Sequence, residues 1–96
     1  MRFRFRSNRL KALYTEERGA HKYPAGVVDA FFDVLAVIVA AKDERDLREL
    51  KGWRYEKMSG QRQHQHSIRL NRQFQLVLEW DQEGRYILIV DIEDYH

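Results

Sequence analysis

Two neighbouring segments between residues 65 and 80 alternate apolar and polar side chains, and this alternation constrains the fold more than any other feature. In the first segment, His66, Ile68 and Leu70 fall on one face of a strand. In the second, the residues of one face are Phe74, Leu76, Leu78 and Trp80. Because side chains in a strand have a period of two, the pattern predicts strands over residues 65–70 and 74–80. Each strand needs a core for its apolar face, so the rest of the chain must supply one.

The first half of the chain predicts helices. Ser7 is a suitable N-cap, and apolar residues follow it at helical spacing, so we expect a helix from Asn8 to about Glu17. Residues 27–41 are strongly apolar. A buried strand is the competing interpretation, but the run is long for a strand, and we expect a helix that packs into the core over most of its circumference. Asp43 is a suitable cap for a short helix that continues to Lys51.

Three further strands are expected. Residues 1–6 place Phe3 and Phe5 on one face, residues 53–58 precede a turn, and residues 86–92 follow a hairpin loop that contains Gly84. The last strand is apolar on both faces, so it belongs inside the sheet. Helices that precede most of the strands predict an α+β fold of two layers, with N-terminal helices packed on a mainly antiparallel β-sheet. Residues 1–96 are long enough for a single domain with one core.

Charge is segregated along the sequence, although the formal net charge is only +2. No acidic residue precedes Glu16, and the basic residues before it are Arg2, Arg4, Arg6, Arg9 and Lys11. A second basic stretch runs from Lys51 to Arg72, whereas acidic residues prevail from Glu79 onward. Such a field suits a polyanionic partner, whereas composition alone favours the alternative, an ordinary solvated surface.

The chain contains no cysteine, which excludes disulfides, thiolate zinc sites and cysteine nucleophiles and fits a cytoplasmic location. The basic N-terminus lacks the apolar segment of a signal peptide. The apolar run at 27–41 is shorter than the roughly 20 residues that a membrane-spanning helix needs, so no membrane partner is expected. His64 and His66 are close enough to suggest a metal site, but no carboxylate or thiol pattern accompanies them, and we expect neither a metal nor another cofactor.

Two short motifs carry a resemblance to a known family. Residues 65–74 read QHSIRLNRQF, and the last four residues read EDYH. The first run resembles the Ser-Ile-Arg-(Val/Ile)-Asn-x-Gln-(Trp/Tyr) segment of the HigB toxins, and the second resembles their closing Asp-Tyr-His. The opening, at Phe5, Leu10, Leu13 and Tyr14, and residues 54–59 also resemble the family, so nearly the whole chain is covered. HigB toxins belong to the RelE/ParE superfamily, so the resemblance implies a RelE/ParE-like fold.

The resemblance also implies a function. HigB toxins belong to type II toxin–antitoxin systems, and the family implies a ribosome-dependent endoribonuclease that cleaves mRNA without a metal ion. It further implies a cognate helix-turn-helix antitoxin of the HigA type. The complex would then bind operator DNA only through that antitoxin.

Metal-free RNA cleavage needs a base for the 2′-hydroxyl, a cation for the charge on phosphorus and an acid for the leaving oxygen. His96 is the natural acid or base, Asp94 could orient it or act as the base, and Tyr95 could stack on a nucleobase. The candidate catalytic residues are His96, Tyr95, Asp94, Arg62, Arg69 and Gln73. The candidate RNA-binding residues are Arg54, Lys57, Arg72 and Asn71.

Simpler roles exist for several of these residues. A histidine at a chain end is often frayed and inert, and Arg69 could form a structural ion pair with Glu79 of the next strand. Four positions also depart from the family pattern: Gln75 stands where an arginine is usual, His64 where a glycine is common, and Glu56 and Ser59 where some members carry histidine and lysine.

These departures motivate two other functions. The chain could be a non-catalytic RNA-binding or partner-binding module on the same fold, which a weakened set of cations would suit. It could also be a gyrase-directed toxin of the ParE branch, although the closing Asp-Tyr-His argues against that branch.

Overall fold

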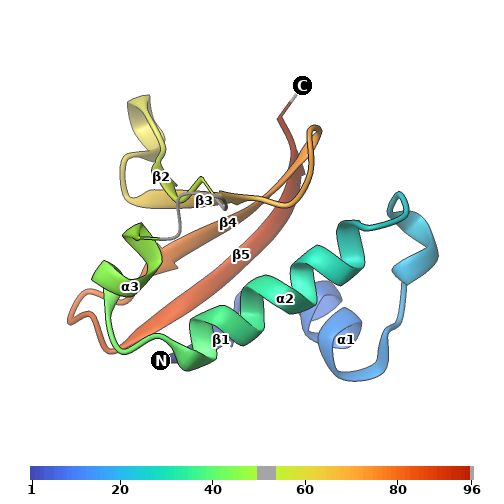
Figure 1. Ribbon diagram of the computed structural model, residues 1–96, viewed down its shortest axis with the longest axis horizontal. Coiled ribbons are helices and arrows are strands. Elements are labelled where there is room, and N and C mark those ends of the chain that lie inside the picture. The colour runs from blue at the N-terminus through green and yellow to red at the C-terminus, as the bar shows by residue number, and fades with distance from the viewer. Residues whose placement is uncertain (50–53, 96) are drawn as a thin grey trace.

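A computed structural model describes residues 1–49 and 54–95 of the chain (Figure 1). In this part of the chain, a five-stranded sheet forms one layer and three α-helices pack on one of its faces. The strands are β1 (Arg2–Phe5), β2 (Glu56–Lys57), β3 (Gln65–Arg69), β4 (Phe74–Trp80) and β5 (Tyr86–Asp94). The helices are α1 (Asn8–Glu16), α2 (Val27–Ala40) and α3 (Glu44–Arg48), with short 3-10 helices η1 (Ala20–Lys22) and η3 (Gly60–Arg62). The expected two-layer α+β fold is confirmed.

The strands follow the order β1-β5-β4-β3-β2. Strand β5 lies inside the sheet, antiparallel to β4 and parallel to β1, and the pairs β4–β3 and β3–β2 are antiparallel. The position of β5 agrees with its apolar side chains on both faces. The chain therefore enters the sheet at one edge, leaves it for the helices, and returns to fill the sheet from the opposite edge inward.

A β-bulge interrupts the pairing of β4 with β5. Val77 pairs with Asp91 and Leu78 with Ile89, so Val90 is the additional residue on β5. A bulge shifts the alternation of side chains by one position. For this reason Ile89 and Ile92, three residues apart, both reach the core.

The helix ends are capped as expected. Ser7 Oγ accepts a hydrogen bond of 3.3 Å from the Leu10 amide at the start of α1. Asp43 Oδ1 accepts one of 2.9 Å from the Arg45 amide at the start of α3. Because these side chains satisfy amides that have no partner within the helix, they define where each helix begins.

A single hydrophobic core fills the space between the helices and the sheet. Helix α2 contributes Phe31, Leu35 and Ile38, which are fully buried. The core residues from the other helices and the strands are Leu10, Leu13, Leu47, Ile68, Leu76, Leu78, Ile87 and Ile89. Since valine-rich sequences have weak intrinsic helix propensity, this packing is what holds α2 in a helical conformation.

Some element bounds differ from those expected. Of the strand expected over 53–58, Trp53 lies outside the described residues, and the rest is reduced to Glu56–Lys57; Arg54 has a φ of 50°, which no regular strand accommodates. Helix α3 ends at Arg48, and the remainder of the expected helix includes residues outside the described part. Strand β5 continues to Asp94 because that residue still pairs with Phe74 of β4. No helix in the described ranges has the length and apolar character needed to cross a bilayer.

Candidate active site

The face of the sheet opposite the helices carries the candidate residue Arg69, and we call it the helix-free face. Strand partners have their side chains on the same side of a sheet, so the register assigns its members. They are Gln65, Ser67 and Arg69 of β3, Gln75, Val77 and Glu79 of β4, and Glu93 of β5. Arg69, Gln75 and Glu93 form one row across three strands.

The end of β5 meets the turn between β3 and β4. The Tyr95 amide donates to the Gln73 carbonyl at 2.9 Å, and the Tyr95 hydroxyl donates to the Asn71 carbonyl at 2.7 Å. The Arg69 guanidinium lies 5.0 Å from the centre of the Tyr95 ring, a cation–π contact. Gln73 Nε2 also donates to Asp94 Oδ2 at 2.7 Å. Two segments that are distant in sequence, residues 69–73 and residues 94–95, are therefore in contact, and these contacts involve five of the candidate residues.

Asn71 shapes the turn itself. Its side-chain Oδ1 accepts hydrogen bonds from the amides of Gln73, at 2.8 Å, and Phe74, at 2.7 Å. An asparagine that accepts from amides two and three residues ahead forms an Asx-type turn, which stabilises the hairpin. Asn71 was a candidate RNA-binding residue, and the structure gives its Oδ1 a role in positioning Gln73 and Phe74, while its main-chain carbonyl accepts from Tyr95. Arg72 is exposed at the tip of the same turn.

Arg62 reaches this face from η3 and is held by acidic and amide groups. Its Nη1 and Nη2 donate to the two carboxylate oxygens of Glu93 at 2.9 and 2.7 Å, and its Nε donates to Gln65 Oε1 at 2.8 Å. The carboxylate of Glu93 raises the pKa of the guanidinium. Arg62 is thus close to the row that contains Arg69, but its charge is neutralised by a neighbour.

The network continues along β3 and β4. Gln65 Nε2 donates to Glu79 Oε2 at 2.7 Å, and Arg6 Nη2 donates to Glu79 Oε1 at 2.8 Å. Burial disfavours the charged form of Glu79, but the hydrogen bonds from Gln65 and Arg6 outweigh it and lower the pKa of Glu79. An ion pair between Arg69 and Glu79, the simpler role considered for Arg69, is wrong, because Arg69 pairs with Gln75 in the register.

Two further candidates, Lys57 and Arg54, lie elsewhere. Lys57 pairs with His66, whose strand partner Leu78 is a core residue, so Lys57 is on the side of the sheet that carries the helices. There it lines a cavity of about 600 Å³ together with Arg48, His64 and His66. Arg54 is exposed ahead of the edge strand β2. His96 lies outside the described residues.

His66 has a structural environment. Its ring stacks on Tyr55 with centres 4.9 Å apart, and its Nδ1 is buried without a hydrogen-bond partner. Burial lowers the pKa of His66, against the opposing effect of Glu44. Within residues 1–49 and 54–95, no group of three or more histidine, aspartate or glutamate side chains is arranged to hold a metal ion.

Sequence reasoning missed Glu93 and Gln65, the two residues that hold Arg62. A signal was present: Glu93 precedes Tyr95 by two positions, so both fall on one face of a strand, and Gln65 starts the alternation of β3. Together the exposed Arg69, the Tyr95 ring and the Arg62–Glu93 pair offer a partly cationic surface. Such a surface can bind a phosphate and stack a base.

Comparisons with known proteins identify the family and the fold. Residues 3–96 match the sequence model of the RelE-like toxin of type II toxin–antitoxin system HigB. Toxin HigB-1 of Vibrio cholerae serotype O1 is 31% identical over 80 residues, which cover 83% of this chain and 84% of that protein. The toxin–antitoxin complex RelBE2 from Mycobacterium tuberculosis contains a chain of similar fold, with a TM-score of 0.55 and 16% identity over 97% of this chain and 95% of that chain.

Proposed function

The chain belongs to the RelE-like HigB toxins of type II toxin–antitoxin systems, and from this premise we propose that it is a ribosome-dependent endoribonuclease that cleaves mRNA. One observation carries the proposal. Tyr95, which follows β5, contacts the β3–β4 hairpin beside Arg69 on the helix-free face, and the adjacent Asp94, whose strand partner Phe74 packs on the core side, accepts a hydrogen bond from Gln73 of the same hairpin. An RNA strand that reached this face would meet cationic, aromatic and carboxylate groups together.

The proposed reaction is a transesterification. The 2′-oxygen attacks the adjacent phosphorus and loses its proton to a base, while the bond to the 5′-oxygen breaks and that oxygen gains a proton from an acid. Asp94 and His96 are the proposed proton carriers, with His96 suited to donating to the 5′-oxygen because its unperturbed pKa is near 6.5. The products are a 2′,3′-cyclic phosphate and a 5′-hydroxyl end, and no metal ion takes part.

Arg69 is the proposed cation for the charge that develops on the phosphate. Its guanidinium is exposed, and the contact with the Tyr95 ring fixes its position. Preorganised cations stabilise a developing negative charge without reorganisation during the reaction. The hydroxyl of Tyr95 is bonded to the Asn71 carbonyl, which holds the ring as a platform for a nucleobase.

The proposed partners follow from the same family. A HigA-type helix-turn-helix antitoxin would neutralise the toxin and bind operator DNA on behalf of the complex. The structure of similar fold is a toxin–antitoxin complex, which supports an antitoxin as a partner of this chain. The ribosome and its mRNA would be the other partners.

A non-catalytic binding module is the second candidate function. It is favoured by the Arg62–Glu93 pair, because a cation already bonded to a carboxylate is less available to a phosphate. Gln75 and Ser59 stand at positions where the family has cations, and the loss of these cations also favours a non-catalytic module.

A reconstituted assay separates the two functions. The purified chain is incubated with a defined mRNA, either free or positioned on ribosomes, and cleavage is mapped by primer extension. The nuclease proposal expects cuts in ribosome-bound message, intact free message, and loss of cutting in Arg69→Ala but not in the exposed control Arg18→Ala. Intact message in both states, with normal ribosome binding, would favour the binding module.

A further inference from the structure

A cavity of about 600 Å³ lies between helix α3, the strands β2 and β3, and the turn that follows β4 (Figure 1). Glu44 and Arg48 line it from α3, and Lys57 and His66 line it from the paired strands β2 and β3. Trp80, the last residue of β4, is also part of the wall. Small-molecule sites in proteins have volumes of roughly 300–1,000 Å³, so this cavity has the size of a ligand site.

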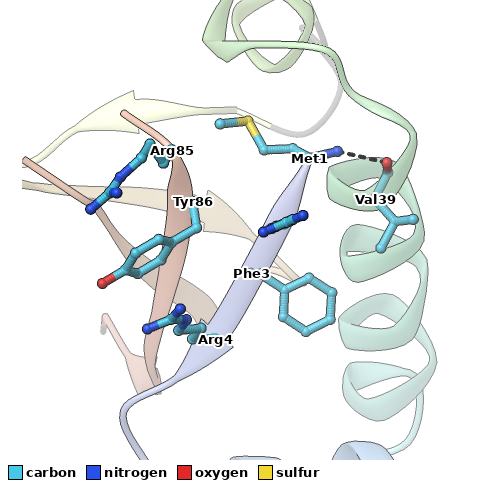
Figure 2. A pocket seen from close by; sticks show the side chains of 7 residues that line it. Met1, Phe3, Arg4, Val39, Arg85 and Tyr86 are labelled. Atoms are coloured by element: carbon cyan, nitrogen blue, oxygen red, sulfur yellow. Dashed lines mark hydrogen bonds between the residues drawn. The ribbon is translucent and has the colours of Figure 1, made fainter. Parts of the chain in front are cut away.

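The start of the chain closes one side of this cavity. The amino group of Met1, which is part of the lining, donates hydrogen bonds of 2.7 Å to the carbonyls of Val39 and Ala41 at the end of α2. Figure 2 shows the bond to Val39 and the position of Met1 at the start of β1. Met1 also lines a smaller cavity of about 420 Å³, which follows β1 to Arg4 (Figure 2). The wall at Met1 is therefore fixed by bonds to the main chain of α2.

The aromatic part of the wall is braced by hydrogen bonds. His66 stacks on Tyr55, with ring centres 4.9 Å apart and an angle of 9° between the ring planes. Trp80 Nε1 donates to the Tyr55 hydroxyl at 2.7 Å, and that hydroxyl donates to Glu44 Oε2 at 2.9 Å. Because these contacts join α3 to β3 and β4, they hold the rings in fixed orientations. Rings held in this way form a surface on which a planar base can stack.

The cavity has an excess of positive charge. Among the described residues, each acidic side chain of its lining is paired with an arginine, namely Asp43 with Arg45, Glu44 with Arg48 and Asp81 with Arg85. In the same part of the chain, the lining residues Lys42 and Lys57 form no ion pair. Burial lowers the pKa of His66, and the positive charges of Arg48 and Lys57 lower it further against the effect of Glu44, so both cations lie near this ring. Lysines without a carboxylate partner are available to a phosphate.

We propose that this cavity binds a nucleotide, with the phosphate at Lys42 and Lys57 and the base at His66 and Trp80. A phosphate needs cations and a base needs an aromatic surface, and the cavity offers both within one volume. An acidic peptide would use the cations alone and leave the aromatic wall without a partner. The site does not depend on the proposed nuclease reaction, because it lies on the other side of the sheet from Arg69.

The experiment uses AMP as the probe and two matched controls. Adenosine lacks the phosphate, and ribose 5-phosphate lacks the base. Binding of each to the full chain is measured by isothermal titration calorimetry, and the bound position is mapped from backbone amide shifts in NMR spectra. These measurements involve no ribosome and no cleavage, so their outcome is independent of the nuclease proposal.

The expected result is that AMP binds at least about tenfold more tightly than either control, because only AMP contacts both the cations and the rings. The amides of Lys57 and His66 should shift, and the amide of Arg69 should not. Lys57→Ala should weaken the binding of AMP about tenfold, and Lys42→Ala, outside the strands, should have a similar effect. Lys11→Ala removes the same charge from an exposed position on α1 and should leave the affinity unchanged.

Several results would overturn the proposal. These are the absence of AMP binding, equal affinities for AMP and ribose 5-phosphate, and unchanged affinity in folded Lys57→Ala and Lys42→Ala. Shifts confined to residues around Arg69 would also overturn it, because they would place the nucleotide on the helix-free face.

Two sources supply such a nucleotide, a free mononucleotide and the end of an RNA strand. A 5′-phosphorylated RNA hexamer distinguishes them once AMP has been found in the cavity. A hexamer that binds more tightly than AMP and shifts the same amides of Lys57 and His66 would identify the end of an RNA strand as the ligand. A hexamer that leaves these amides unchanged would identify a free nucleotide.

Discussion

The carboxylate of Glu93 binds both Nη atoms of Arg62, at 2.9 and 2.7 Å, on the helix-free face that also carries Arg69. A bidentate pair of this kind is the geometry that a phosphate would adopt with the same arginine. Glu93 therefore occupies a position on Arg62 that RNA would need.

Replacing Glu93 by glutamine should strengthen RNA binding. The change removes one negative charge and the strongest hydrogen-bond acceptors of Arg62, so the affinity for a short single-stranded RNA should rise about three- to tenfold at low salt. The measurement is fluorescence anisotropy with purified protein. Asp91→Asn is the matched control, because it releases Arg9 from an ion pair on the same strand with the same change of charge. Equal gains in the two variants would mean that net charge, and not Arg62, governs binding.

Replacing Arg69 by alanine should remove most of the activity and little of the stability. Loss of one preorganised cation should lower the rate of ribosome-dependent cleavage about 100-fold. The free energy of unfolding should change by less than about 1 kcal/mol, since the side chain is exposed and its contact with Tyr95 is a surface one. Single-turnover cleavage and urea unfolding test the two halves of this expectation. An active variant would contradict the role assigned to Arg69.

The stability of helix α2 should depend on its packing in the core rather than on the intrinsic helix propensity of its residues. Leu35 is fully buried in the core, so Leu35→Ala should lower the free energy of unfolding by about 2–5 kcal/mol. Val39 lies on the same helix but is exposed, so Val39→Ala should change it by less than about 0.5 kcal/mol. Denaturant titration monitored by circular dichroism measures both. Similar losses in the two variants would contradict the packing described here.

His66 should make the fold less stable in mild acid. Burial lowers the pKa of its imidazole in the folded chain, so at pH values below about 6.5 the unfolded chain takes up a proton more readily than the folded chain. Stability should therefore be highest above that pH and fall as the pH decreases toward the lowered pKa.

The histidine can be tested by substitution. His66→Phe keeps an aromatic ring to stack on Tyr55 and removes the titrating group, so it should flatten the dependence of unfolding free energy on pH between about 5 and 7. His21→Phe, at an exposed position, is the control. A pH dependence that survives in His66→Phe would assign it to other groups.

The sequence predicted the fold well because the relevant signals are local. Period-two alternation located β3 and β4, and Ser7 and Asp43 marked the helix starts, since each depends on residues within a few positions. The bulge at Val90 could not be predicted, because it follows from the pairing of β5 with β4. The shortening of β2 also had no local signal, because a positive φ at Arg54 is unusual for a residue other than glycine.

The candidate site was harder to predict. The resemblance to a family identified Arg69, Gln73, Asp94 and Tyr95, and the structure brings these residues together. The neutralisation of Arg62 by Glu93 depends on contacts between η3 and β5, which composition and spacing do not encode. Likewise, Lys57 looked like part of one basic surface, but the strand register turns it to the side that carries the helices.

The central claim is that this HigB-family toxin cleaves mRNA on the ribosome. The most direct test maps mRNA 5′ ends in cells after a short induction of the chain alone, beside His96→Ala and the control Arg18→Ala. The account predicts cuts inside translated reading frames that disappear when translation initiation is blocked, with loss of cutting in His96→Ala only. Intact message and normal growth at normal levels of the folded wild-type chain would contradict it.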